Sequence, residues 1–268
     1  MLAPGCSERS APRPLSSTEE PERAPVAAPP LYRAIELGAT GSIAGTVRFR
    51  GEPPALEPMA VGARRDACGE AQPPPVLRIG PRGGVADVVV TLVGIREGKA
   101  LEPATVRFDR AGCRFEPHVA VATLGDTVRF GSRDAVLHNV RGTLDGERWI
   151  DVGLARAGDE ASAAADRAGV VRLVCDAGHG WELAWLHVAA HPYATVTDEQ
   201  GRFQIADVPA GSYTLRVWHE GWRPIGRAAG RPRYSAPVVL SRALSVIERQ
   251  ETTLDFELSE QAAEAAGE

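Results

Sequence analysis

The chain has 268 residues, of which 44% are hydrophobic and 24% are charged, and its formal net charge is −5. This composition is ordinary for a soluble protein with one large or two modest cores, because domains commonly contain about 100–150 residues. A negative net charge argues against nucleic acid as a partner. No run of about 18 apolar residues occurs, so the sequence does not predict a transmembrane helix.

Residues 1–40 are predicted to form a leader and a flexible linker. The segment starts with MLAPGC and then becomes rich in Pro, Ser and Glu, as flexible tethers are. LAPGC resembles the end of a bacterial lipoprotein signal peptide, in which Cys6 would carry the lipid. The basic and hydrophobic parts that precede such a cysteine are missing, so we expect translation to start upstream of Met1. The resemblance implies a periplasmic or cell-surface protein that meets the membrane only through Cys6; the alternative is a disordered leader.

From Gly41 onward, short apolar or alternating runs separated by Gly, Pro, Asp and Asn predict an all-β chain. A first domain is expected over residues 41–190, and its seven or eight strands predict a Greek-key β-sandwich. Residues 155–169 are predicted to form a short helical turn or a polar loop. The candidate strands of this domain are GSIAGTVRFRGEPP, VADVVVTLVG, CRFEPHVAVATLGDTVRFGS, LHNVRGT, ERWIDVGL, GVVRLV and LAWLHVAA.

A second domain is expected over residues 191–260. It contains the turns TDEQGRF and DVPAGSY and a strand in which Tyr213, Leu215 and Val217 share a face. This stretch resembles the carboxypeptidase regulatory-like domain, a small prealbumin-like β-sandwich without peptidase activity. TTLDFELSE would supply its last strand, and residues 41–54 resemble its first, so this N-terminal strand is expected to pack with it. Residues 261–268 are predicted to be a frayed tail.

The eight residues CDAGHGWE place a thiol and an imidazole in a short loop between two apolar runs. Cys175 stands where a predicted strand ends, whereas a structural cysteine is usually a small hydrophobe within an element. His138 follows another β-run in AVLHNV. A thiolate and two imidazoles near one plane, with a weaker axial ligand, make up the ligand set of an electron-transfer copper. Cys175, His179 and His138 are therefore candidate metal ligands.

Five segments in order strengthen this interpretation: CRFEPHV, GDTVRFGSRDAVLHNV, VRLVCDAGHGW, HPYATVTDEQGRF and VPAGSYTLRVWHE. Together they resemble a cupredoxin, a plastocyanin-like copper domain, joined to a carboxypeptidase regulatory-like domain. The resemblance covers about residues 41–258. It implies that His138, Cys175 and His179 are copper ligands and that Asn139 braces the ligand loop by hydrogen bonding near the cysteine. Trp181 is predicted to pack beside the site, as a core or rim residue rather than an electron relay.

The fourth ligand departs from the cupredoxin pattern. Cupredoxins commonly have a methionine shortly after the second histidine, whereas this chain has Glu182, and Met1 and Met59 are distant in sequence. We predict that Glu182 is the axial ligand. The alternative leaves Glu182 in solvent and copper three-coordinate or completed by a carbonyl or water. A carboxylate would favour Cu(II), lower the reduction potential and make zinc a competitor.

The remaining cysteines and histidines receive other roles. With Cys6 assigned to lipid and Cys175 to metal, Cys68 and Cys113 are predicted to form a disulfide, since oxidising compartments keep such bridges. The alternative is two buried free thiols. The other four histidines are predicted to be sheet or interdomain residues: His118, His187, His191 and His219. Of these, only His118 is a candidate neighbour of the metal.

The resemblance predicts an exported mononuclear copper protein that transfers single electrons and catalyses no reaction of its own. It names neither the redox partner nor the oligomeric state. One alternative, favoured by Glu182, is a non-redox structural or ligand-binding surface module that lost or never used copper. Copper storage or delivery would need exposed ligands, usually several Met or His in clusters, and this chain has no Met cluster. A catalytic thiol is disfavoured, because no helix begins after Cys175 to lower its pKa.

Overall fold

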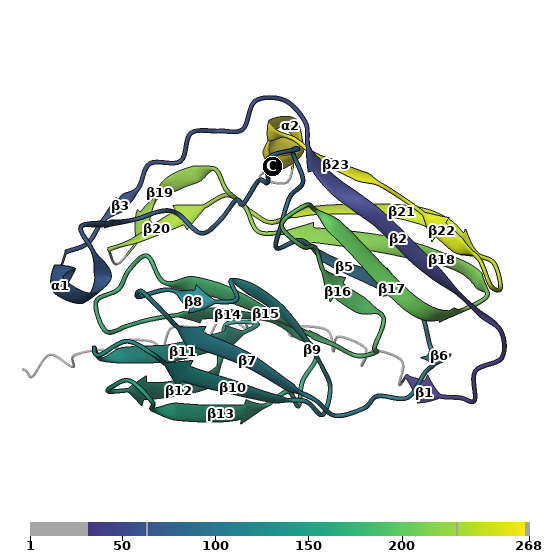
Figure 1. Cartoon of the computed structure of the whole chain (residues 1–268), viewed down its shortest axis with the longest axis horizontal. Coiled ribbons are helices and arrows are strands. Elements are labelled where there is room, and N and C mark those ends of the chain that lie inside the picture. The colour runs from purple at the N-terminus through teal and green to yellow at the C-terminus, as the bar shows by residue number, and fades with distance from the viewer. Residues whose placement is uncertain (1–31, 63, 229, 266–268) are drawn as a thin grey trace, which may run out of the picture. The chain divides into compact units, whose positions relative to one another are not determined.

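The structure is a computed structural model that describes residues 32–265 apart from residues 63 and 229. Within one compact unit, Leu31–Glu268, the strands form two β-sandwiches (Figure 1). The all-β prediction is confirmed. No helix in the described segments is long and apolar enough to cross a membrane. The predicted lipidation site, Cys6, lies outside the described residues.

The first sandwich consists of two sheets with the strand orders β13-β10-β7-β8 and β12-β11-β14-β15-β9. Strands that follow one another in sequence change sheet several times, as they do in Greek-key sandwiches. The β7–β10 and β9–β15 pairs are parallel, and the other pairs are antiparallel. The strands are β7 (Thr105–Arg110), β8 (Phe115–Glu116), β9 (Val119–Thr123), β10 (Thr127–Ser132), β11 (His138–Leu144), β12 (Glu147–Leu154), β13 (Glu160–Ala164), β14 (Gly169–Val174) and β15 (Leu183–Ala189).

Strand β15 shows how the sequence pattern builds this sandwich. Its alternating burial directs Ala184, Leu186 and Val188 into the core between the two sheets. Successive side chains of a strand point to opposite faces, so Trp185 and His187 face the other way. Both rings contact Trp218 of the second sandwich, with centroids 5.4 and 4.3 Å apart. One strand therefore serves a core and a contact with the neighbouring sandwich.

The second sandwich has the strand orders β16-β5-β18-β21 and β17-β2-β22, with β23 pairing β2 beyond β22. Leu215 and Val217 are fully buried in its core and Tyr213 packs against it, which confirms their predicted common face. The strands are β2 (Thr40–Phe49), β5 (Val89–Val93), β16 (Ala194–Val196), β17 (Arg202–Pro209), β18 (Gly211–His219), β21 (Val238–Val246), β22 (Glu251–Thr253) and β23 (Phe256–Leu258).

The predicted boundary between the domains needs a correction. The strand predicted at residues 41–54 does pack in the second sandwich, where β2 pairs with β17. The run VADVVVTLVG, which we assigned to the domain at 41–190, also belongs there, because its strand β5 pairs with β16 and β18. An apolar run shows that a strand is buried but not in which sheet. The first sandwich accordingly begins at β7.

Two smaller predictions were also wrong. Residues 155–169 hold strand β13, which pairs with β10 at a sheet edge; its Ala- and Ser-rich sequence carries little strand propensity, and the ladder to β10 decides its conformation. The predicted tail begins inside helix α2 (Glu260–Ala265), where the Ala262 N–H donates to Ser259 Oγ and Trp222 Nε1–H donates to Glu260 Oε1.

Two excursions leave the second sandwich and reach the end of the first where β14 finishes. The first runs between β2 and β5 and contains β3 (Met59–Ala60), α1 (Arg65–Cys68) and β4 (Ala71–Gln72). The second is the hairpin of β19 (Pro224–Ala228) and β20 (Arg231–Tyr234). A further short pair joins β1 (Arg33–Ala34) to β6 (Glu97–Gly98). The two excursions supply contacts to the candidate site.

Candidate metal centre

Two neighbouring strands position the first two candidate ligands. His138 is the first residue of β11, and Cys175 directly follows β14, which pairs with β11. The Asn139 backbone N–H donates to Cys175 Sγ at 3.4 Å. Both side chains are fully buried. The sheet therefore fixes a thiol and an imidazole side by side at one end of the sandwich.

The loop between β14 and β15 supplies the other two candidates. Gly178 has a φ of 91°, a left-handed conformation that glycine adopts without steric cost. The Glu182 N–H donates to the His179 carbonyl at 3.0 Å, which closes a tight turn. This turn folds Glu182 back, so that its carboxylate faces the imidazole of His179.

The four donor groups converge on one point. The Nδ1 atoms of His138 and His179 lie 3.2 Å apart, and Cys175 Sγ lies 3.6 Å from His179 Nδ1. Glu182 Oε1 lies 2.8 Å from His138 Nδ1 and 3.1 Å from His179 Nδ1. One donor atom from each of the four residues lies within 4.8 Å of every other. The structure thus brings together all four residues that the sequence analysis selected as ligands.

The donor set fits a single first-row metal ion. Bond lengths of about 2.0–2.3 Å in a tetrahedral site separate neighbouring ligand atoms by about 3.3–3.6 Å. The four donor-atom distances given above range from 2.8 to 3.6 Å. Within the described part of the chain, the buried Glu182 Oε1 makes no hydrogen bond of regular geometry, although Nδ1 of His138 lies 2.8 Å away and Nδ1 of His179 3.1 Å away. Buried polar atoms are rarely left unsatisfied. An ion bound to Glu182, His138, His179 and Cys175 would satisfy it.

The protonation equilibria reflect this crowding. Burial alone would lower the pKa of His179, but the Cys175 and Glu182 side chains outweigh it and raise the pKa to about 9. Burial alone would raise the pKa of Glu182, but His138, His179 and Arg110 hold it down to about 2. Without a metal, the cluster therefore keeps an anionic carboxylate beside a cationic imidazole.

Arg110, the last residue of β7, is the counter-ion of Glu182. Its Nε–H donates to Glu182 Oε2 at 2.9 Å, and neither side chain is exposed to solvent. A second guanidinium nitrogen donates to the Asn139 carbonyl at 3.1 Å, and the guanidinium lies 3.2 Å from the centroid of the Phe115 ring. One carboxylate oxygen of Glu182 is thus held by Arg110 while the other faces the two imidazoles.

The predicted neighbours of the site also lie close to it. Asn139 Oδ1 accepts from the Asp176 N–H at 3.4 Å, so this side chain ties β11 to the ligand loop. The Trp181 ring lies 5.2 Å from the ring of His179, and its Nε1–H donates to the Cys113 carbonyl at 2.9 Å. Both residues therefore orient the loop.

The predicted disulfide between Cys68 and Cys113 is present. Cys68 Sγ lies 3.9 Å from Nε2 of His179. The bridge joins the β3–β4 excursion to the first sandwich, and around it Met59, Val61, Val136 and Trp181 form a small apolar cluster. Met59 is therefore close to the ligand loop in space, although it is far from it in sequence.

The hairpin β19–β20 covers the other side of the loop. Arg231 donates to the Cys175 carbonyl and pairs with Asp176 at 2.7 Å. As whole residues, His179 and Glu182 are each 2% exposed. The candidate centre is consequently enclosed by the two excursions as well as by its own sandwich.

The other histidines lie elsewhere, as predicted. His118 contacts Glu220 of the second sandwich through Nε2 and the Leu183 carbonyl through Nδ1. Burial would lower the pKa of His118, but Glu220 raises it overall. Three others pack against aromatic rings or backbone of the second sandwich: His187, His191 and His219. None of these four is in the ligand group found among the described residues.

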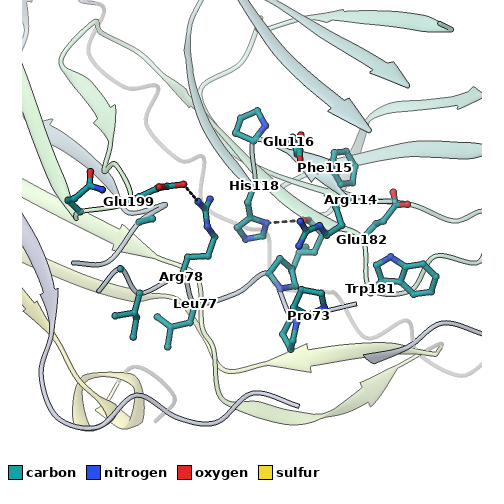
Figure 2. A pocket seen from close by; sticks show the side chains of 18 of the residues that line it. Pro73, Leu77, Arg78, Arg114, Phe115, Glu116, His118, Trp181, Glu182 and Glu199 are labelled. Atoms are coloured by element: carbon teal, nitrogen blue, oxygen red, sulfur yellow. Dashed lines mark hydrogen bonds and ion pairs between the residues drawn. The ribbon is translucent and has the colours of Figure 1, made fainter. Parts of the chain in front are cut away.

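A cavity of about 780 Å³ lies beside the centre. Figure 2 shows Trp181 and Glu182 on one side of it and the Arg78–Glu199 ion pair on the other, with His118 between them. Trp181 therefore contacts both the candidate ligand His179 and this cavity. The cavity therefore adjoins the enclosed centre at Trp181 and Glu182.

Sequence analysis did not identify three polar residues around the site. Asp134 Oδ2 lies 3.1 Å from Nε2 of His138, and Arg110 and Arg231 make the contacts given above. The chain has 30 basic residues, so no single arginine is distinctive. For Asp134 a weak signal existed, since it lies four residues before His138, and a carboxylate on the far nitrogen of a ligand histidine is common.

A family model matches part of the chain. It is described as polysaccharide lyase family 4, domain II, and it matches residues 162–224. This segment includes strands of both sandwiches and is less than half of the chain, so it does not assign the chain to that family. The likeness to the carboxypeptidase regulatory-like domain stays a prediction. No curated protein matches the chain.

Several solved structures are similar to about a third of the chain. The Cu-containing nitrite reductase from Thermus scotoductus SA-01 is 22% identical over 34% of this chain and only 24% of its own, with a TM-score of 0.30. A purple cupredoxin from Nitrosopumilus maritimus is 17% identical over 31% of this chain and 99% of its own (TM-score 0.28). The blue copper protein auracyanin A from Chloroflexus aurantiacus is 20% identical over 33% of this chain and 100% of its own (TM-score 0.29). At these scores the similarities do not identify a function.

Proposed function

We propose that this chain is an exported protein that carries single electrons by means of one copper ion held by His138, Cys175, His179 and Glu182. The observation that supports this most directly is the buried cluster of their donor atoms, all within 4.8 Å of one another. Thiolate and imidazole together suit copper, whereas oxygen-only sets suit magnesium or calcium. Copper would supply a one-electron couple at this position.

The protein's own residues would keep the ligands fixed during electron transfer. Asn139 and Asp176 tie the ligand loop to β11, and Arg110 holds Glu182 in place. The disulfide between Cys68 and Cys113 fixes the β3–β4 excursion next to His179. Rigid support lowers the cost of changing the charge of the centre, because the ligands do not rearrange. The low exposure of the ligands would exclude water.

The proposal includes an oxidising compartment and a lipid anchor. The disulfide supports export, since such bridges persist mainly outside the cytosol. Anchoring through Cys6 rests on the resemblance of LAPGC to a lipoprotein processing site. The second sandwich, with its predicted likeness to a carboxypeptidase regulatory-like domain, would act as a binding or spacing module. The electron partner is a redox protein or small redox molecule.

A second candidate function is a structural zinc site in a non-redox surface module. The presence of a carboxylate among the four donors favours it, because zinc accepts Cys, His and carboxylate in a tetrahedral set. Such a site would stabilise the fold without carrying electrons, since zinc has no redox chemistry. The same four residues would hold the ion in either case.

Reconstitution of the metal-free full chain distinguishes the two. With Cu(II), the electron-transfer proposal predicts a strong thiolate-to-copper absorption and an EPR signal of a single copper, both reversibly lost on reduction. Cys175→Ser removes the thiolate and should abolish the absorption. If copper binds without that absorption, or if bound copper cannot be reduced and reoxidised, the electron-transfer proposal fails. If the chain binds one zinc ion but does not bind copper with these properties, the structural alternative is supported.

A further inference from the structure

Arg110 is a charged side chain placed where solvent cannot reach it. Its side chain and that of Glu182 are both 0% exposed. Burial lowers the pKa of Arg110, while Glu182 and Cys175 act to raise it. A guanidinium stays protonated under nearly all conditions in proteins. Among the described residues, one of its terminal nitrogens has no hydrogen-bond partner. Stability of the core alone does not require this buried ion pair, because an apolar pair of similar size is often as stable.

The charge of the centre depends on the oxidation state. Metal ligands bind in deprotonated form, so Cys175 and Glu182 each contribute one negative charge. With Cu(II) the ion and these two ligands sum to zero, and with Cu(I) they sum to minus one. A fixed positive charge at Arg110 therefore interacts more favourably with the reduced centre than with the oxidised one. Because the site is enclosed, this interaction is weakly screened.

We infer that Arg110 is the buried counter-ion of the metal centre, which raises its reduction potential and offsets the preference for Cu(II) that the Glu182 carboxylate introduces. The inference deepens the proposed function and rests on it. Arg110 reaches the centre without being a ligand, because its Nε–H bonds Glu182 Oε2 while Oε1 faces the imidazoles. It is a positioning residue that also supplies charge.

Other charges near the centre do not replace this one. Asp134 faces His138 from the far side and favours the oxidised state, but its side chain is 12% exposed and also accepts from the N–H groups of Gly112 and Cys113. Arg231 contacts the loop at the Cys175 carbonyl, and it is paired with the exposed Asp176. The counter-ion effect is thus assigned to Arg110 as the one fully buried cation that touches a ligand side chain in the described structure.

Three variants of the full copper-loaded chain separate charge from positioning. Arg110→Gln keeps a donor, because the Gln amide nitrogen occupies the same position along the side chain as the arginine Nε, but it removes the charge. Arg110→Lys keeps the charge. Arg133→Met serves as the control. It removes a cation that is 67% exposed and is paired with Asp109, the residue before Arg110 in β7.

The first readout is the reduction potential, which is monitored through the thiolate-to-copper absorption. The second readout is the zinc affinity of the metal-free protein. We expect a lower potential and tighter zinc binding for Arg110→Gln, and values near the parent's for Arg110→Lys and Arg133→Met. Equal potentials for the parent and Arg110→Gln would overturn the inference, as would an equal loss for Arg110→Gln and Arg110→Lys, which would indicate positioning alone.

Two further arms keep the test decisive. If Arg110→Gln does not fold, Glu182→Gln is compared with Arg110→Gln/Glu182→Gln, in which no buried carboxylate lacks its partner. The inference again predicts a lower reduction potential for the double variant than for Glu182→Gln, and equal potentials would overturn it. If the parent binds copper without thiolate absorption, the proposed function fails, and the counter-ion inference is then judged by the zinc affinities alone, which must differ between the parent and the Arg110→Gln variant.

Discussion

The Nδ1 atoms of His138 and His179 lie 3.2 Å apart, although the residues are 41 positions apart in sequence. At most one of these two atoms can usefully carry a proton toward the other, because two N–H groups that face each other have no acceptor between them. Cys175 and Glu182 add two further acceptors around the same point. A metal cation bound by all four groups, as proposed, would explain why they face one another in a buried place.

The first prediction concerns the joint dependence of metal binding on the imidazoles and the thiol. His138→Ala and His179→Ala should each weaken copper binding by at least about tenfold, since loss even of a residue that only orients a ligand costs 10–100-fold. Cys175→Ser should abolish the thiolate absorption, because a hydroxyl is too hard a donor to replace the sulfur. Competition with a chelator and visible spectroscopy measure both effects.

His187→Phe is the matched control for these ligand variants. His187 packs on Trp218, away from the ligand group, so its replacement should leave copper affinity and spectrum unchanged. An unchanged spectrum in Cys175→Ser would refute the ligand assignment. So would a loss of copper in His187→Phe as large as that in His179→Ala.

The second prediction concerns the axial position. Glu182→Met should raise the reduction potential and move the absorption toward that of blue copper proteins, because a thioether donates more weakly than a carboxylate. The variant also leaves Arg110 buried without its partner, and such a change costs about 3–5 kcal/mol of folding stability. Potentiometry and denaturant unfolding check the two effects.

The double variant Arg110→Met/Glu182→Met separates the ligand effect from the ion-pair effect. Both buried charges are then absent, so its stability should recover much of the loss seen in Glu182→Met. Its spectrum should still resemble that of blue copper. If Glu182→Met binds copper with the potential and spectrum of the parent, Glu182 is not a ligand.

Much of the candidate centre could be predicted from the sequence because its signals are local. Cys175 and His179 stand in a short loop after an apolar run, and His138 opens a run of strand residues. The strand pairing that brings β11 beside β14 is a property of the sandwich that these runs predict. Glu182 could be placed because a three-residue spacing after His179 permits a turn.

Arg110 and the membership of β5 could not be predicted in this way. A buried arginine has the same sequence surroundings as an exposed one, and its role depends on a carboxylate 72 positions away. The apolar residues of β5 would suit either core, and only the pairing with β18 decides between them. Such long-range choices depend on the packing of the whole chain rather than on local propensity.

The third prediction concerns the disulfide. In a metal-free chain that carries Cys6→Ser, thiol counting under denaturing, non-reducing conditions should find one free thiol, that of Cys175. Three free thiols would contradict the bridge. Replacing Cys68 and Cys113 together by serine should lower the free energy of unfolding by about 4 kcal/mol, the chain-entropy value for a separation of 45 residues.

The last prediction concerns the pH dependence of stability. Burial lowers the pKa of His187 to about 3, and its Nε2 has no hydrogen-bond partner among the described residues. The unfolded chain, with a histidine pKa of about 6.5, therefore binds this proton more readily than the folded chain. The contribution of His187 to stability is complete above about pH 6.5 and is lost as the pH falls toward 3. At about pH 5 the loss should be about 2 kcal/mol.

His187→Phe removes the titrating group and keeps a ring against Trp218, so its free energy of unfolding should fall less between about pH 7 and pH 5 than that of the parent. Denaturant unfolding of both metal-free proteins at the two pH values gives the comparison. Equal losses in the two proteins would mean that His187 is not held neutral by burial.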